Sequence, residues 1–360
     1  MKSAVSIVPA FVLILFAHST MATEIDERRC SSDRPNNCLN GVGPAVINPD
    51  TIRTSSTLFS SQISNQSNKD QEQAYLSPSL SGMSAGNSFS GWGIWASYNN
   101  SGFDADLPIN SLVQPIASYD AKQHNVMIGA DKLLMGKLVI GLALGYEDTD
   151  IATAYHGGNN EIEGFSVVPY FAYLINDVFS IDAAAGYTTL DYNTDRIDNV
   201  SGGTIVGEFD ADRWFITSGI NATLVHNQWI FGARAGYLYT EEKQDGYTET
   251  GPNTARIIRD RHIDLSQGIL ALNISYSFGW LEPYAHLAYH NDLGRDEGIG
   301  AGGLPAGTGP TQPDDDDEFQ TSLGFRYFGD VVSGTLEWTT VHGRDHFNSN
   351  SILLTIRADL

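Results

Sequence analysis

From residue 90 to the C-terminus, large apolar residues alternate with small or polar ones at the period of two that is typical of a β-strand. The stretch 138–146 (LVIGLALGY) is the clearest example, because leucine, isoleucine and tyrosine fall on one face and glycine, alanine and valine on the other. The pattern predicts twelve strands, at 90–99, 119–133, 138–149, 162–175, 178–191, 208–225, 229–241, 261–277, 281–291, 318–328, 331–342 and 351–360.

The connections between these strands alternate in length. Tight turns are expected at 135–137, 176–177, 227–228, 278–280 and 329–330. Longer loops are expected at 100–118, 150–161, 192–207, 242–260, 292–317 and 343–350. An even strand number, with short turns at one end and long loops at the other, is typical of a bacterial membrane barrel. Both barrel termini would then lie at the short-turn, periplasmic end.

A soluble β-sandwich also alternates, and two features favour a barrel over it. Aromatic residues gather at the ends of the apolar faces, as in the girdles at membrane edges. The opposite faces carry small residues and the charges Arg234, Glu282, Arg326, Glu337 and Arg357, which suit a polar lumen. The sequence therefore predicts an all-β, 12-stranded antiparallel transmembrane β-barrel with a short N-terminal helical plug segment.

The region before the barrel divides into two predicted parts. Residues 1–22 have the basic start, the nine-residue apolar run and the small-residue end of a signal peptide. In residues 23–89, Cys30 and Cys38 are expected to form a disulfide in an exported protein. A weakly amphipathic plug helix is predicted within about 48–76, and 90–360 is the barrel domain.

Charge excludes one class of function. The chain has 43 Asp and Glu against 20 Lys and Arg, a formal net charge of -23, which argues against nucleic-acid binding. With 41% hydrophobic and only 18% charged residues, the chain is not a disordered acidic polymer.

Several strand motifs occur in an order found in one known family: Trp92-Gly93-Ile94-Trp95, NVMIGAD at 125–131, GLALGY at 141–146, GARAGY at 232–237 and LEPYA at 281–285. Residues 90–360 thus resemble the autotransporter β-domain, the translocator of type V secretion. The resemblance implies a Gram-negative outer-membrane protein, inserted by the barrel-assembly machinery, whose barrel is threaded by a helix while a passenger crosses to the surface.

Applied to this chain, the resemblance places the plug within 48–76. Arg234, Glu282, Arg326, Glu337 and Arg357 would face it as an interior charge network, or be hydrated without touching it. Two departures stand out. Residues 23–47 are too short for a β-helical passenger, so almost nothing would be secreted, and the last residue is Leu360 where outer-membrane proteins usually end in Phe or Trp.

The acidic run Asp314, Asp315, Asp316, Asp317 and Glu318 is a candidate cation-binding loop, since divalent cations prefer clustered carboxylates and also bridge lipopolysaccharide. The competing interpretation is a solvated acidic loop. No cofactor and no metal site are predicted, because no nucleophile elbow, phosphate loop or cysteine-rich zinc motif occurs.

Other functions remain open at this point. A cation-preferring pore or a surface adhesion protein acting through its acidic loops, with an unknown ligand, would fit the same barrel. An outer-membrane protease using His342 and Asp345 at the rim, or zinc binding by His286 and His290, has less support, and we expect no enzyme. Expected partners are outer-membrane lipid, lipopolysaccharide and the barrel-assembly machinery, with the long loops outside the cell.

Overall fold

The computed structural model of the protein describes residues 53–57, 62, 91–108, 116–153, 157–198, 201–252, 254–296, 316–329, 331–345 and 347–360. Its strands are β1 (Trp92–Pro108), β2 (Ile116–Leu134), β3 (Leu138–Thr153), β4 (Gly158–Leu174), β5 (Phe179–Ile197), β6 (Thr204–His226), β7 (Trp229–Gln244), β8 (Tyr247–Gly251), β9 (Thr254–Ile258), β10 (Arg261–Tyr276), β11 (Leu281–Asp296), β12 (Asp317–Phe328), β13 (Val332–His342) and β14 (Phe347–Asp359).

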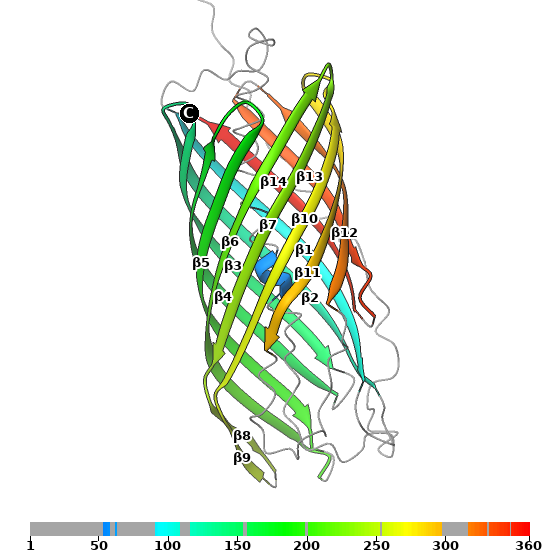
Figure 1. Cartoon of the computed structure of the whole chain (residues 1–360). Coiled ribbons are helices and arrows are strands. Elements are labelled where there is room, and N and C mark those ends of the chain that lie inside the picture. The colour runs from blue at the N-terminus through cyan, green and yellow to red at the C-terminus, as the bar shows by residue number, and fades with distance from the viewer. Residues whose placement is uncertain are drawn as a thin grey trace, which may run out of the picture.

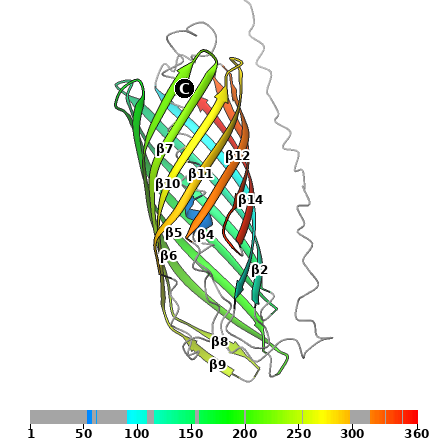
Figure 2. The same cartoon turned by 45° about the vertical axis from the view of Figure 1, so that its right-hand side comes forward.

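Twelve of these strands form a closed antiparallel barrel (Figure 1). Each pairs with its neighbours along the chain, and β1 closes the ring against β14 from Gly93–Asp359 to Ala105–Phe347. The remaining two, β8 and β9, form a hairpin that continues the sheet past β6 through the pair Val206–Thr250. The hairpin projects from the long-loop end, opposite the end where the C-terminus lies (Figures 1 and 2). The predicted strand number and barrel are confirmed.

The outer wall carries the apolar residues of the alternation. Ile94, Leu142, Ile220 and Leu270 are examples that each expose half or more of their surface. Aromatic side chains form a band near each end: Trp229 packs 5.0 Å from Tyr276 near the tight turns, and Trp214 packs 5.0 Å from Tyr239 nearer the loops. This distribution matches a wall that faces lipid between two interfaces.

The inner face carries apolar as well as polar residues, which differs from the polar lumen that the sequence predicted. Buried apolar residues form two clusters inside the barrel. The cluster toward the tight turns comprises Trp95, Met127, Val139, Ala143, Val168, Tyr170, Ala172, Ala184, Phe215 and Leu238. The cluster toward the long loops includes Phe103, Tyr119, Ile151, Ile162, Leu190, Tyr192, Phe209, Tyr247 and Phe347. Polar and charged side chains occupy the level between them.

Glycines on the inner wall make room for the rings of the lower cluster. A Cβ atom on Gly141 would lie 2.1 Å from Tyr170 Cζ, and one on Gly186 would lie 2.1 Å from Phe215 Cε1. Tyr170 then accepts a 2.7 Å hydrogen bond from Trp95 Nε1 and donates one of 2.7 Å to Asp131. The small residues seen in the sequence at these positions therefore allow large rings to lie flat across the neighbouring strand.

The strands are longer at the loop end than the alternation predicts. β1 was expected to end at residue 99 and continues to Pro108, and the expected loop 242–260 contains β8 and β9. Beyond the membrane level the outward face is polar, and the apolar residues turn inward, as Phe103 and Ala105 do. The apolar positions thereby change phase, which ends the outward apolar pattern before the strand itself ends.

Residues 53–57 and Gln62 are helical and lie inside the barrel (Figure 1). They fall within the region 48–76 where a plug helix was predicted. In the part of the chain that the structure describes, no helix has the length and apolar character needed to cross a membrane. Cys30, Cys38 and the predicted signal peptide lie outside the described residues.

Candidate functional site

The candidate site is the interface between the internal helix and the barrel wall. Gln123 on β2 donates a hydrogen bond from Nε2 to Ser55 Oγ at 2.5 Å. Ser56 donates to Thr240 Oγ1 on β7 at 2.9 Å. Ser97 on β1 donates to Gln62 Oε1 at 3.0 Å. All these polar groups are buried, so the helix is held by side-chain hydrogen bonds to strands that lie on different sides of the lumen.

Near Ser55 on the barrel wall, Arg213 lies between Glu147 and Glu242. Arg213 donates from Nη1 to Glu147 Oε1 at 2.8 Å and from Nε to Glu242 Oε2 at 2.8 Å. The three side chains are at most 1% exposed. Ser55 lies beside Glu147, so the helix contacts this cluster. Two carboxylates so close together need the guanidinium, because burial without a counter-charge is strongly unfavourable.

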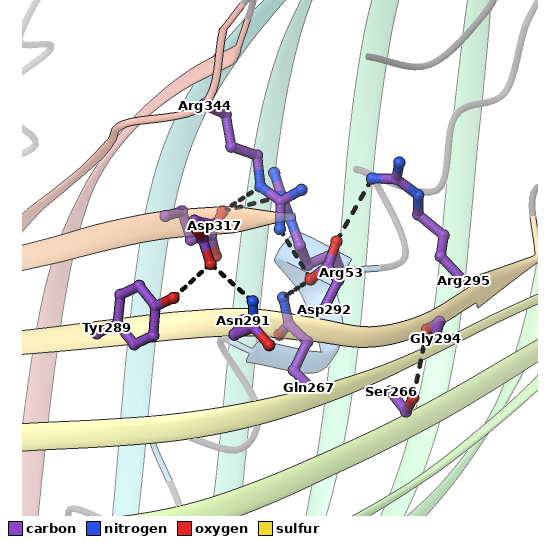
Figure 3. Close-up of polar contacts among 11 residues, drawn as sticks. Arg53, Ser266, Gln267, Tyr289, Asn291, Asp292, Gly294, Arg295, Asp317 and Arg344 are labelled. Carbon is purple, nitrogen blue, oxygen red and sulfur yellow. Dashed lines mark hydrogen bonds and ion pairs between the residues drawn. The ribbon is translucent and has the colours of Figure 1, made fainter. Parts of the chain in front are cut away.

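A second ionic cluster holds the N-terminal residue of the described helix (Figure 3). Arg53 Nη1 lies 2.8 Å from Glu318 Oε2, and its guanidinium stacks 4.3 Å from the centre of the Phe347 ring. Arg344 reaches in from the β13–β14 connection and pairs with both Glu318 at 2.9 Å and Asp292 at 2.8 Å. Helix, loop and wall therefore share one set of buried ion pairs.

A β-bulge on β11 aims two charged residues into this cluster. The register against β10 shifts between Gln267–Asp292 and Ser266–Gly294, which leaves Leu293 as the extra residue. Asp292 accepts a 2.8 Å hydrogen bond from Gln267, and Arg295 lies 3.4 Å from Asp292 (Figure 3). The bulge allows residues three apart to interact inside the barrel, which strict alternation forbids.

The helical segment has a definite direction within the barrel. Arg53 contacts Glu318 and Phe347, which are among the first residues of β12 and β14 and therefore near the long-loop end. Gln62 contacts Ser97, which lies close to the short-turn end where β1 begins. The described residues from Arg53 to Gln62 thus lie in order from the long-loop end toward the short-turn end, where β1 begins.

The β8–β9 hairpin is attached to the same interior. The ring of Tyr247 on β8 stacks 4.5 Å from Phe209, which stacks 4.6 Å from Tyr192. Tyr192 donates a 2.7 Å hydrogen bond to Glu242 of the Arg213 cluster. Arg196 also forms two hydrogen bonds with Glu249 of β8, at 3.0 and 2.6 Å. Burial raises the pKa of Tyr247, so this phenol stays neutral.

The five predicted lumen charges lie inside the barrel in three separate groups. Arg326 pairs with Glu282 at 2.7 Å and stacks on Tyr284, which donates to Glu337 at 2.6 Å. The second group joins Arg234 to Asp182 by hydrogen bonds from both Nη atoms. The third joins Arg357 to Asp131 by hydrogen bonds of 2.7 and 2.8 Å. The charges therefore form separate local groups, whereas the resemblance implied a single interior network.

The described residues of the predicted acidic run lie on opposite faces of the barrel wall. Asp317 is exposed on the outer face and accepts hydrogen bonds from Tyr289 at 2.5 Å and Asn291 at 2.6 Å (Figure 3). Glu318 points inward and holds Arg53 and Arg344. Asp316 is exposed, and Asp314 and Asp315 lie outside the described residues. Among the described residues, no group of three or more His, Cys, Asp or Glu side chains is placed to hold a metal ion.

Sequence reasoning missed the residues that hold the helix. The alternation did indicate that Glu147, Arg213 and Glu242 face inward. Each lies one or three residues from an outward aromatic residue, namely Tyr146, Trp214 and Tyr239. The alternation alone does not reveal which charges meet across the lumen. Arg344 had no signal, since it enters from a loop where no periodicity applies.

Barrel, girdles and an internal helix directed toward the first strand define an outer-membrane β-barrel of the translocator type. Residues 110–333 match the family described as Autotransporter beta-domain. The chain belongs to this family, which places it in the bacterial outer membrane. No curated protein matches the chain.

Solved structures with the same fold are also autotransporter barrels. The translocator domain of the autotransporter NalP from Neisseria meningitidis is 13% identical, with a TM-score of 0.63 over 86% of this chain and 99% of that one. The β-domain of the Bordetella autotransporter BrkA is 17% identical, with a TM-score of 0.57 over 75% and 100%. The transport unit of AIDA-I from Escherichia coli is 11% identical, with a TM-score of 0.52 over 81% and 97%.

Proposed function

We propose that this translocator carries the segment before Arg53 out through the long-loop end of the barrel, and that residues 53–62 then remain in the lumen as its plug. The direction of the helix is the observation that carries this proposal. A chain that enters β1 from the short-turn end and leaves the lumen beside Glu318 and Phe347 has its N-terminal part at the opposite mouth.

The ionic contacts support a plug that stays in place after transport. Arg53 is held by Glu318 and Phe347 at one end, and Ser55 and Ser56 are hydrogen-bonded to opposite walls. The long loops would then face the exterior and the barrel termini the periplasm. Residues 23–47, with the expected Cys30–Cys38 disulfide, would be the part presented at the surface.

Contacts with lipid and lipopolysaccharide, and insertion by the barrel-assembly machinery, belong to the same proposal. The outward apolar wall and its aromatic bands support lipid contact. We assign no catalytic role, and the cation-pore and adhesion alternatives have no specific contact in their favour.

An epitope placed after residue 22 tests the orientation. In intact cells an external antibody should bind the epitope, because the N-terminal segment lies outside. Binding that occurs only after the outer membrane is permeabilised would contradict the proposal. An epitope fused after Leu360 is the matched control, and it should bind antibody only after permeabilisation.

A further inference from the structure

Four uncharged side chains on the inner faces of β1 and β2 form a patch beside the helix, here named the amide patch. Asn99 lies opposite Asn125, and Ser101 lies opposite Gln123 in the strand register. All four residues are at most 1% exposed. In the part of the chain that the structure describes, no hydrogen-bond partner is found for the buried polar atoms Asn99 Oδ1, Ser101 Oγ, Gln123 Oε1 and both polar atoms of Asn125.

The helix uses only part of this hydrogen-bonding capacity. Gln123 donates to Ser55, but among the described residues Thr57 Oγ1 and Gln62 Nε2 are buried without hydrogen-bond partners. A cavity of about 40 Å³ lies beside the helix, with Arg53, Thr57, Asn99, Glu318 and Ser351 in its lining. Asn99 therefore faces a small gap next to the helix, whereas Gln123 contacts the helix directly.

The amide patch belongs to an uncharged sector of the wall. Among the described residues, the inward positions of β14, β1 and β2 at this level are Ser349, Ser351, Leu353, Ser97, Asn99, Ser101, Gln123, Asn125 and Met127. The two ionic clusters around Arg213 and Arg344 lie on other strands. Among the described residues, these three strands thus carry no inward charge at this level; Gln123 and Ser97 hold the helix, and the other donors and acceptors of the amide patch are unused.

We propose that the amide patch binds the main chain of an extended polypeptide as it passes through the lumen, an inference that rests on the proposed translocator function. An extended segment has one N–H and one C=O per residue, and these need partners wherever side chains exclude water. Asn and Gln amides donate and accept at the same time. Because they carry no charge, they replace water for any passing sequence without holding oppositely charged residues.

The test measures how fast an epitope placed after residue 22 reaches the cell surface in pulse-labelled cells. The triple variant N99L/Q123M/N125L keeps side-chain volume and removes the amides. We expect it to expose the epitope at least about fivefold more slowly than the natural chain, because three hydrogen-bonding positions are lost. Heat-modifiable gel mobility reports whether each barrel has folded.

The control variant is S166A/T188V, which removes a buried inner-wall pair on β4 and β5 whose hydroxyls are bonded to each other at 2.8 Å. It should export at the natural rate. Equal rates for the triple variant and this control would overturn the inference. If the natural chain never exposes the epitope, the proposed function fails and the inference fails with it. If the natural chain exposes the epitope and the triple variant does so at the same rate, only the inference fails.

A second variant decides the matter if the triple variant does not fold. N125D keeps the size of the side chain and places one carboxylate in the amide patch, opposite Glu147 of β3. If the passing chain contacts residue 125, a lysine-rich epitope should be exported several-fold more slowly than an aspartate-rich one in this variant. The natural chain should treat the two epitopes alike. Equal export of both epitopes by N125D would overturn the inference.

Discussion

Arg213 and Glu147 form a 2.8 Å ion pair although they lie on β6 and β3, which are separated in the wall by β4 and β5. Glu242 on β7 completes the cluster at 2.8 Å, and Ser55 of the helix lies beside Glu147. The pair thus bridges the curved inner wall, and the helix contacts a rigid ionic group.

We expect R213M to destabilise the barrel by about 3–5 kcal/mol, because it leaves two buried carboxylates without a counter-charge. Urea unfolding of the refolded protein in lipid vesicles would measure the loss. The triple variant E147Q/R213M/E242Q should recover most of it, since no uncompensated charge remains. A loss as large in the triple variant as in R213M would mean that packing, and not charge, explains the effect.

Arg53 should control whether the pore is closed. In R53A the ion pair with Glu318 and the stacking on Phe347 are both lost, so the helix should leave the lumen more often. Planar-bilayer recordings should then show more frequent open events than the natural chain. R295A is the matched control, because Arg295 pairs with Asp292 in the same cluster from the wall. Equal opening in both variants would argue against a plug held by Arg53.

The Tyr170 ring lies over Gly141, so replacement by alanine should destabilise the barrel more at Gly141 than at Gly102. G141A should cost about 1–3 kcal/mol, because the new Cβ would overlap the Tyr170 ring and displace its hydrogen bonds to Trp95 and Asp131. G102A should be nearly neutral, since its Cβ would have only an ordinary 3.8 Å contact with the Ala121 carbonyl oxygen. Unfolding midpoints in urea would measure both. Equal destabilisation would show that strand glycines matter for backbone freedom alone.

Tyr247 should hold the β8–β9 hairpin against the barrel. Y247A removes the stacking on Phe209, worth about 0.5–1.5 kcal/mol beyond burial. External protease added to intact cells should then cut within 245–260 faster than in the natural chain. Cutting only in permeabilised cells would place the hairpin in the periplasm and reverse the proposed orientation. E163Q, which alters a carboxylate bonded to Tyr146 on the outer wall, should not change the rate.

The sequence predicted the barrel well because outward apolar residues must alternate wherever the wall meets lipid. It missed the strand extensions and β8–β9, because above the membrane the apolar residues face inward and the pattern changes phase at residues such as Phe103. It identified inward charges such as Arg234 and Arg357 but not their partners. Which charges pair across the lumen depends on the curvature of the barrel. The inward position of Arg344 depends on a loop that folds inward. A local sequence period encodes neither.

The most direct test of the account is a disulfide between the helix and the wall in living cells. Ser56 Oγ and Thr240 Oγ1 lie 2.9 Å apart, so S56C/T240C should form a bond that mass spectrometry detects in joined peptides. We predict that the molecules carrying this bond also expose an epitope placed after residue 22 to external antibody. A bond with an epitope reached only after permeabilisation, or no bond at all, would contradict a plug whose N-terminal segment lies outside the cell.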